Sequence, residues 1–220
     1  LIDMINQAQV VIFDVDYTLV YGPKADTYYS LYSQLIESVV ADSLNIPLSS
    51  AQQKINRIRQ DYDGRGELAF DLLKVDASIW FDQIIKLEPN QYLNRSKIIP
   101  QLLDRLRSSC KKIVALSDGP LPQINKIFLA SGITPSKFDL IIGWKRGQPK
   151  PKTNPKIFTK IADIFSCKPQ QMIMVGDSYT GDILPALKSG LSTILIRPQP
   201  PQDYAGICLP NIKSLGNLLC

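Results

Sequence analysis

Five short apolar runs, separated by longer stretches of helical periodicity, constrain the fold of this chain more than any other feature. The runs hold three or four residues each and lie at residues 10–13, 113–116, 140–142, 172–175 and 194–196. Such runs, flanked by Gly, Pro or polar residues, are typical of strands buried on both faces. Because helical patterns lie between them, the sequence predicts an α/β fold with a doubly wound, Rossmann-like parallel sheet.

One long segment interrupts this alternation. Residues 22–95 place apolar residues at helical spacing, with a stripe that starts at Tyr28, and they contain no clear strand pattern. We therefore expect an all-helical cap domain inserted after the first strand. In this division residues 1–21 and 96–220 form the α/β core, residues 22–95 form the cap, and aromatic residues such as Trp80 pack inside the cap.

Polar, reactive residues follow three of the predicted strands. They are Asp14, Asp16 and Thr18 after the first run, Ser117, Asp118 and Gly119 after the second, and Asp177, Ser178 and Asp182 after the run at 172–175. A separate loop carries Lys150 and Lys152. Ligands bind beyond the carboxyl ends of the strands in open α/β sheets, so we expect these four segments to meet in one crevice.

The residue types in this crevice indicate phosphate chemistry. The chain contains no histidine, which excludes zinc sites that need imidazole and nucleophile pairs of the Ser–His or Cys–His type. A carboxylate can attack phosphorus to give an aspartyl-phosphate. Clustered carboxylates repel one another unless a cation lies among them, and a hard divalent ion, typically Mg²⁺, suits oxygen ligands.

Together these four segments resemble, in order, spacing and placement at strand ends, the four motifs of the haloacid dehalogenase-like hydrolase superfamily. The resemblance implies an Mg²⁺-dependent phosphomonoester hydrolase in which Asp14 is the nucleophile and Asp16 is the general acid and base. It also implies three groups of site residues. These are Asp14, Asp16 (through its backbone carbonyl) and Asp177 for the metal, Thr18, Ser117, Asp118, Gly119 and Lys152 for the substrate phosphate, and Asp182 and Ser178 as supporting residues.

Two positions depart from the pattern of the superfamily. Asp118 stands where the family often has Asn, which adds a negative charge near the phosphate site. Thr153 follows Lys152 where the family has proline, although the run from Lys152 to Phe158 resembles the family's K-P-x-P-x-x-F motif. Lys150 therefore remains a second, weaker candidate for the phosphate lysine.

The inserted segment resembles the helical C1 cap of pyrimidine 5′-nucleotidase-like or phosphoglycolate phosphatase-like members, most clearly around residues 62–66. This resemblance implies a small phosphorylated metabolite as substrate, with a nucleoside monophosphate as the first candidate. We expect Arg65 in this stretch to be structural or solvated rather than a substrate ligand, because loop charges usually are.

Other functions remain open at this point. A phosphomutase would keep the same four motifs, whereas haloacid dehalogenases generally lack the second aspartate, so Asp16 argues against them. A receiver-type phosphoacceptor module or a non-catalytic phosphate-binding module is the alternative from another class. The position of Asp14 directly after the first strand argues against the receiver, and the Asp14/Asp16 pair argues against a binding module.

Charge and composition limit the partners. The formal net charge of +5 is spread along the chain without a basic arm, so we expect no nucleic-acid polymer as partner. No signal peptide is apparent, no apolar run reaches the length of a membrane span, and the four cysteines form no C-x-x-C pair. The sequence therefore predicts reduced, mostly buried cysteines in a cytoplasmic monomer or homodimer that acts on a small phosphorylated substrate.

Overall fold

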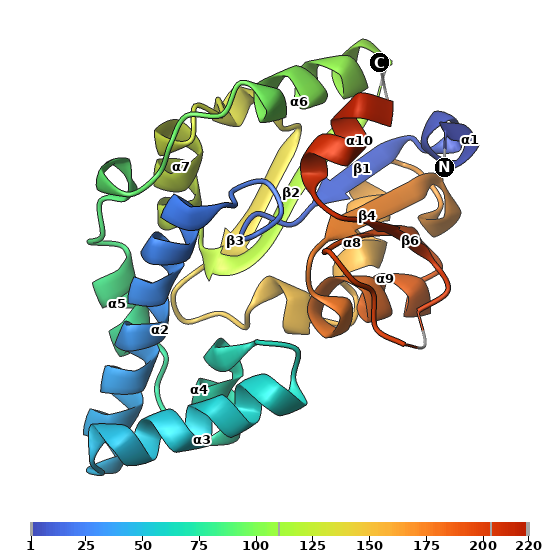
Figure 1. The fold of residues 1–220 in the computed structure, drawn as a ribbon. Coiled ribbons are helices and arrows are strands. Elements are labelled where there is room, and N and C mark those ends of the chain that lie inside the picture. The colour runs from blue at the N-terminus through green and yellow to red at the C-terminus, as the bar shows by residue number, and fades with distance from the viewer. Residues whose placement is uncertain (1, 110, 203, 219–220) are drawn as a thin grey trace.

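A computed structural model describes residues 2–109, 111–202 and 204–218, and its centre is a sheet of six parallel strands. The strands are β1 (Val10–Phe13), β2 (Lys112–Pro120), β3 (Leu140–Trp144), β4 (Met172–Gly176), β5 (Ser192–Ile196) and β6 (Ile207–Leu209). Their order across the sheet is β3-β2-β1-β4-β5-β6 (Figure 1). The predicted doubly wound α/β class is therefore confirmed.

Two strands differ from the prediction. β2 was expected to end before Ser117, but it continues to Pro120 after an irregularity in its pairing with β3. Leu116 pairs with Ile142 and Pro120 pairs with Trp144, so the polar residues between Leu116 and Pro120 bulge out of register. The sixth strand, β6, was missed because it is only three residues long and half-buried at the sheet edge, where no apolar run is required.

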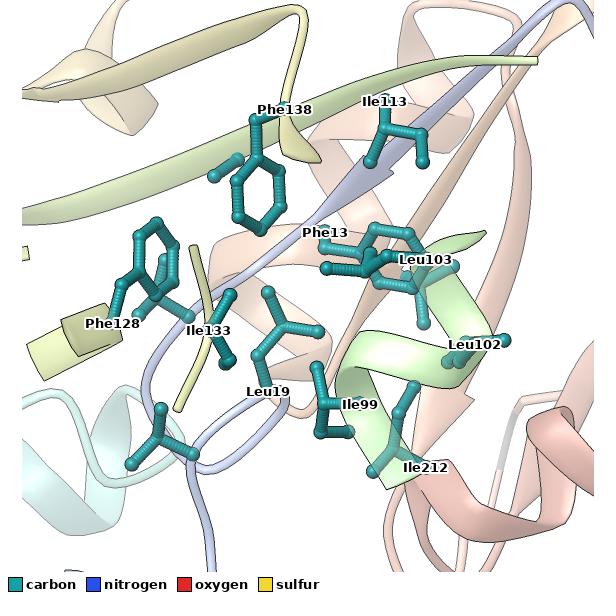
Figure 2. Close-up of a cluster of buried hydrophobic side chains, with 14 of the residues drawn as sticks. Phe13, Leu19, Ile99, Leu102, Leu103, Ile113, Phe128, Ile133, Phe138 and Ile212 are labelled. Atoms are coloured by element: carbon teal, nitrogen blue, oxygen red, sulfur yellow. The ribbon is translucent and has the colours of Figure 1, made fainter. Parts of the chain in front are cut away.

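Helices cover both faces of the sheet. One face carries α1 (Ile2–Gln7), α6 (Ile98–Ser108), α7 (Leu121–Ala130) and α10 (Ile212–Leu218), and the other carries α8 (Ile157–Ile164) and α9 (Leu184–Lys188). Alternate residues of a strand point to opposite faces, so Phe13 joins the first cluster and Ile12 the second. Figure 2 shows Phe13 and Ile113 packed with Leu102 and Leu103 of α6.

The chain between β1 and β2 is helical, as predicted. It holds α2 (Pro23–Leu44), α3 (Leu48–Asp61), α4 (Ala69–Leu72), α5 (Ser78–Ile84) and two short 3₁₀ turns, Gly66–Leu68 and Pro89–Gln91 (Figure 1). These helices enclose their own hydrophobic cluster, which includes Ile55, Phe70 and the buried Trp80, and Trp144 of β3 joins it. This separate cluster supports the proposed division into a core (1–21 and 96–220) and a cap (22–95).

The strand order places a reversal of direction between β1 and β4. The chain proceeds from β1 outward through β2 to β3, then returns to place β4 on the other side of β1. Ligand crevices of doubly wound sheets form where the strand order reverses in this way. Asp14 follows β1 and Asp177 follows β4, so both residues lie at this reversal.

The described cysteines are unpaired, as predicted, although they are half-buried rather than fully buried. Cys167 and Cys208 are free thiols, while Cys110 and Cys220 lie outside the described residues. Among the residues that the structure describes, no helix combines the length and hydrophobicity needed to cross a bilayer.

Candidate active site

A buried ion pair joins two of the predicted motifs. Asp14, which is 4% exposed, accepts a hydrogen bond from the Nζ of Lys152. The same Nζ lies 2.6 Å from Oδ1 of Asp182, so the lysine bridges the carboxyl ends of β1 and β4. The backbone N–H of Lys152 donates to Oδ1 of Asp118 at 2.7 Å, which anchors the lysine loop to β2.

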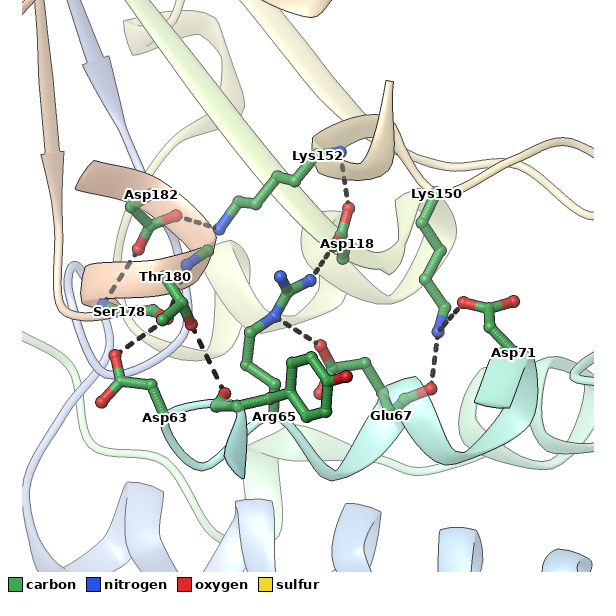
Figure 3. A network of polar contacts seen from close by, with 12 residues as sticks. Asp63, Arg65, Glu67, Asp71, Asp118, Lys150, Lys152, Ser178, Thr180 and Asp182 are labelled. Atoms are coloured by element: carbon green, nitrogen blue, oxygen red, sulfur yellow. Dashed lines mark hydrogen bonds and ion pairs between the residues drawn. The ribbon is translucent and has the colours of Figure 1, made fainter. Parts of the chain in front are cut away.

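The second lysine of this loop faces away from these carboxylates. The Nζ of Lys150 donates to the backbone carbonyl of Glu67 at 2.8 Å and lies 4.0 Å from Oδ2 of Asp71 (Figure 3). It also lies 5.5 Å from the centre of the Phe70 ring. Lys150 therefore connects the lysine loop to the helical segment of residues 22–95. Lys152 is the better candidate for binding phosphate.

The acidic residues at the ends of β1 and β4 form a cluster that fits a divalent cation. Carboxylate oxygens of Asp14, Asp177 and Asp182 all lie within 4.8 Å of one another. The donors are all oxygen atoms, which Mg²⁺ prefers. Asp182 was expected to be a supporting residue, whereas its carboxylate lies together with those of Asp14 and Asp177.

Burial makes negative charge costly in this cluster. Burial and the nearby carboxylates of Asp182 and Asp177 raise the pKa of Asp14 well above its ordinary value, although Lys152 opposes the shift. Burial, followed by repulsion from Asp182, also raises the pKa of Asp177 to about 7. A cation bound among these groups would favour their ionised forms, so the electrostatics agree with the choice of ligands.

The side chain of Asp16 lies outside this cluster and accepts a hydrogen bond from a hydroxyl group. Ser117 donates from Oγ to Oδ2 of Asp16 at 3.4 Å, and the backbone N–H of Gly119 donates to the same Oγ at 2.9 Å. Burial raises the pKa of Asp16, which favours the protonated form that a general acid needs. The bulge of β2 thus brings Ser117 next to Asp16.

Thr18 occupies a different place from the other predicted phosphate-binding residues. It is fully buried, and its hydroxyl donates to Oδ1 of Asp177 at 3.3 Å. Thr18 is absent from the lining of the cavity described below. We infer that Thr18 positions the Asp177 carboxylate and does not contact the phosphate.

The residues after β4 form a π-helical turn, which is wider than an α-helical turn. Tyr179–Ile183 form this turn, and α9 begins directly after it at Leu184. The backbone N–H of Ser178 donates to Oδ2 of Asp182 at 3.1 Å, and Gly181 N–H donates to Oγ of Ser178 at 3.0 Å. Isolated π turns of this kind often lie at functional sites. This one contains Asp182, whose carboxylate lies next to Lys152.

A cavity of about 290 Å³ lies between this edge of the sheet and the helical segment. The predicted residues that line it are Asp14, Asp16, Ser117, Asp118, Gly119, Lys152, Asp177, Ser178 and Asp182. The helical segment contributes Tyr29, Arg65, Glu67 and Trp80, among others. Trp80 therefore packs in the hydrophobic cluster, as expected, and also reaches the cavity wall.

Arg65 connects the helical segment to the carboxyl end of β2. Its Nη2 donates to Oδ2 of Asp118 at 2.9 Å, and its Nε donates to Oε1 of Glu67 at 3.0 Å (Figure 3). The guanidinium side chain is only 17% exposed. The expectation that Arg65 is structural rather than a substrate ligand stays untested, because this residue also lines the cavity.

Asp63 is a second contact of the helical segment that the sequence analysis missed. Its Oδ2 accepts from the backbone N–H of Tyr179 at 2.6 Å and from Oγ of Ser178 at 3.3 Å, and its Oδ1 accepts from Arg197 at 3.0 Å. Asp63 adopts a positive φ of 54° ahead of Gly64. The Asp-Gly pair is a turn signal in the sequence, but its partner after β4 could be identified only from the fold.

The chain is similar to known proteins over most of its length. The sequence profile of the haloacid dehalogenase-like hydrolases matches residues 8–190. Two proteins named glyceraldehyde 3-phosphate phosphatase are similar to the chain. The one from Methanopyrus kandleri is 25% identical over 89% of this chain and 86% of its own length, and the one from Pyrococcus furiosus is 26% identical over 86% and 80%.

Solved structures show the same fold. The crystal structure of a haloacid dehalogenase-type phosphatase from Thermococcus onnurineus has a TM-score of 0.63 and 20% sequence identity, and the alignment covers 96% of this chain and 97% of that one. The profile match extends over most of the chain and includes all four predicted motifs. The chain therefore belongs to the haloacid dehalogenase-like hydrolase family.

Proposed function

We propose that this enzyme hydrolyses a small phosphate monoester through an aspartyl-phosphate formed on Asp14. The observation that carries this proposal is the buried contact between Lys152 and Asp14, beside Asp177 and Asp182, in a cavity closed on one side by helices. A lysine held against a buried carboxylate can neutralise the phosphoryl oxygens when that carboxylate attacks phosphorus.

In the first step, a carboxylate oxygen of Asp14 forms a bond to phosphorus as the bond between phosphorus and the ester oxygen breaks. Asp16 donates its proton to the departing oxygen, which leaves as an alcohol. The raised pKa of Asp16, caused first by burial, keeps a proton available for this transfer. Lys152 and the hydroxyl of Ser117 bind the phosphoryl oxygens during the transfer.

In the second step, Asp16 acts as a base. It accepts a proton from a water molecule, whose oxygen attacks phosphorus and breaks the bond to Asp14. Free phosphate leaves, and both aspartates return to their starting protonation states. The helical segment limits the entry of bulk water, since Tyr29, Arg65 and Trp80 line the cavity opposite the carboxylates.

We propose Mg²⁺ as the cofactor, held by carboxylate oxygens of Asp14 and Asp177 with the backbone carbonyl of Asp16, and with Asp182 next to them. When bound, a divalent cation supplies positive charge that stabilises the transferring phosphoryl group and keeps the carboxylates ionised. Thr18 orients Asp177 through its 3.3 Å hydrogen bond. The side chains of the protein bind and orient the substrate phosphate and exchange protons with the substrate and with water.

A triose phosphate is the first substrate to test, because two relatives bear the name glyceraldehyde 3-phosphate phosphatase. A nucleoside monophosphate is the second candidate, from the resemblance of the helical segment to nucleotidase caps. A phosphomutase would retain the same aspartates but would move phosphate between positions of one substrate. The presence of Asp16 argues against carbon–halogen chemistry.

The test is the release of free phosphate from a panel of monoesters in the presence of Mg²⁺. The panel holds glyceraldehyde 3-phosphate, glycerol 3-phosphate, pyrimidine and purine monophosphates, sugar phosphates and an aryl phosphate. We expect release that disappears with EDTA, and a phosphorylated Asp14 peptide in rapidly quenched samples. If folded protein releases no phosphate from any ester, or if Asp14→Asn releases it at the wild-type rate, the proposal is wrong.

A further inference from the structure

The cavity contains more acid than base. Among the described residues that line it, seven carry carboxyl groups and three carry basic groups. Five of the carboxyl groups lie at the sheet edge, and Asp63 and Glu67 come from the helical segment. A divalent cation would offset two formal charges, and a substrate phosphate would then add negative charge.

Each of the three basic groups already faces a carboxylate. Lys152 faces Asp14 and Asp182. Arg59 lies 3.0 Å from Glu37, although its other terminal nitrogen, Nη2, is buried without a hydrogen-bond partner. Every basic side chain among the described lining residues therefore already has a carboxylate partner before a ligand enters the cavity.

Arg65 is the basic group that lies between the sheet edge and the helical segment, and two carboxylates neutralise it. Asp118 and Glu67 bind different nitrogens of its guanidinium at 2.9 and 3.0 Å. Asp118 is the position where the sequence departs from the Asn that the family often has. An amide there would leave Arg65 with one carboxylate partner instead of two, and part of its charge would then be available to a ligand.

On the basis of the proposed hydrolysis, we propose that this cavity selects phosphate monoesters with an uncharged leaving group, such as a hydroxyaldehyde or polyol, and rejects those that carry a second anionic group. Asp118 enforces this selection by neutralising Arg65. Like charges placed together in a poorly solvated site are strongly unfavourable, so a substrate carboxylate near Glu67 and Asp118 binds weakly. A hydroxyl or aldehyde group makes no such contact.

The test uses substrate pairs that differ only in this charge. One pair is glyceraldehyde 3-phosphate and 3-phosphoglycerate, and the other is 2-hydroxyethyl phosphate and phosphoglycolate. We expect kcat/KM for the uncharged member to exceed that for the carboxylate member by roughly tenfold or more in both pairs. Equal values, or a preference for the carboxylates, would overturn the inference while leaving the hydrolase proposal in place.

Asp118→Asn tests the role assigned to Asp118. Its amide oxygen can still accept from the Lys152 backbone N–H, but the side chain no longer carries the charge that faces Arg65. We expect the ratio of the two kcat/KM values to shift toward the carboxylate substrates by about tenfold, mainly through a lower KM for them. Adding Arg65→Gln to Asp118→Asn should reverse this shift, because the charge that was freed is removed.

The matched control is Asp71→Asn, which likewise replaces one carboxylate by an amide, here in α4 of the helical segment. Asp71 lies 4.0 Å from Lys150 and outside the cavity lining, so the ratio should equal that of the wild type. If Asp118→Asn and Asp71→Asn leave the same ratio, the selection does not come from Asp118 and the inference is wrong. If neither member of any pair releases phosphate, the hydrolase proposal fails and this inference fails with it.

Discussion

The pKa values of carboxyl groups are shifted in opposite directions at the two ends of the sheet. At the carboxyl end, burial and mutual repulsion raise the pKa values of Asp14 and Asp177. At the amino end, the backbone N–H of Ile113 and the side chain of Lys112 hold the pKa of Asp139 below its ordinary value, against the partial burial of its side chain. The same residue type therefore costs folding free energy at one end and contributes it at the other.

The carboxylates at the two ends of the sheet differ in how well their charge is matched by hydrogen-bond donors and cations. Asp139 has donors matched to its charge, as structural carboxylates usually do. The carboxylates that follow β1 and β4 have one lysine among several acids, an arrangement that folding alone would not favour. Such unbalanced charge is typical of sites that bind a cation or a substrate.

The largest expected difference between the two ends is in catalysis. Asp14→Asn should lower the rate of phosphate release by on the order of 10³-fold or more, because the amide oxygen is a poor nucleophile. Asp139→Asn, the matched change at the amino end, should leave the rate within about twofold of wild type. Steady-state assays on the preferred ester, with both variants checked for folding, measure this. Similar losses in both variants would remove the distinction.

The two lysines of residues 150–152 provide the next comparison. Lys152→Met should lower kcat/KM by about 100-fold, because a buried positive charge next to the phosphoryl group is lost. Lys150→Met should chiefly lower the free energy of unfolding, by about 1–2 kcal/mol, since the Glu67 carbonyl loses its donor. Kinetics and denaturant unfolding of both variants check this. If Lys150→Met lost more kcat/KM than Lys152→Met, Lys150 would be the phosphate lysine.

Asp177→Asn should stabilise the metal-free protein. A carboxylate whose pKa rises from 3.8 to about 7 on folding makes folding less favourable as the pH increases from about 4 to 7, and the cost persists above pH 7. The amide removes this cost and can still accept from Thr18. We expect a gain of about 1–2 kcal/mol at pH 8 in EDTA.

Added Mg²⁺ supplies the second half of this measurement. It should raise the Tm of the wild type and have a smaller effect on Asp177→Asn, because one proposed ligand is missing. Thermal unfolding with EDTA and with Mg²⁺ gives all four values. A variant that is less stable than wild type in EDTA at pH 8 would contradict the cost assigned to this carboxylate.

The smallest expected effect is at the amino end. Asp139→Asn should lower the free energy of unfolding at pH 7 by about 1 kcal/mol, through a weakened hydrogen bond to Ile113 and the loss of largely surface ion pairs. Because the pKa of Asp139 is lowered on folding, its contribution is present above about pH 4 and disappears as the pH falls further. Denaturant unfolding should therefore show a larger difference between Asp139→Asn and wild type at pH 7 than at pH 3.

The sequence predicted the parallel sheet and the grouping of the motifs because both depend on local patterns. Buried strands produce apolar runs, and parallel strands bring their carboxyl ends together, so Asp14 and Asp177 could be placed without coordinates. The bulge in β2 and the π turn before α9 left no such pattern. Both depend on contacts between residues far apart in the chain, such as the hydrogen bonds to Asp16 and Asp63.

The residues that the helical segment contacts in the core could not be predicted from the sequence either. Residues 62–66 were recognised as a loop, but a loop charge gives no sign of which residue it will face. The partners of Arg65 and Asp63 are 53 and 134 residues away along the chain, at Asp118 and Arg197. Their pairing follows from how the helices pack on the sheet, and only the fold shows that packing.

The bulge in β2 has a consequence for how such enzymes evolve. Ser117, Asp118 and Gly119 lie between two registered pairs with β3, and β1 has already ended beside them. Substitutions at these positions can therefore alter the chemistry of the cavity without disturbing the hydrogen-bond ladder of the sheet. A descendant that acquires a new substrate range through one change at this bulge would keep the strand pairs on either side of it.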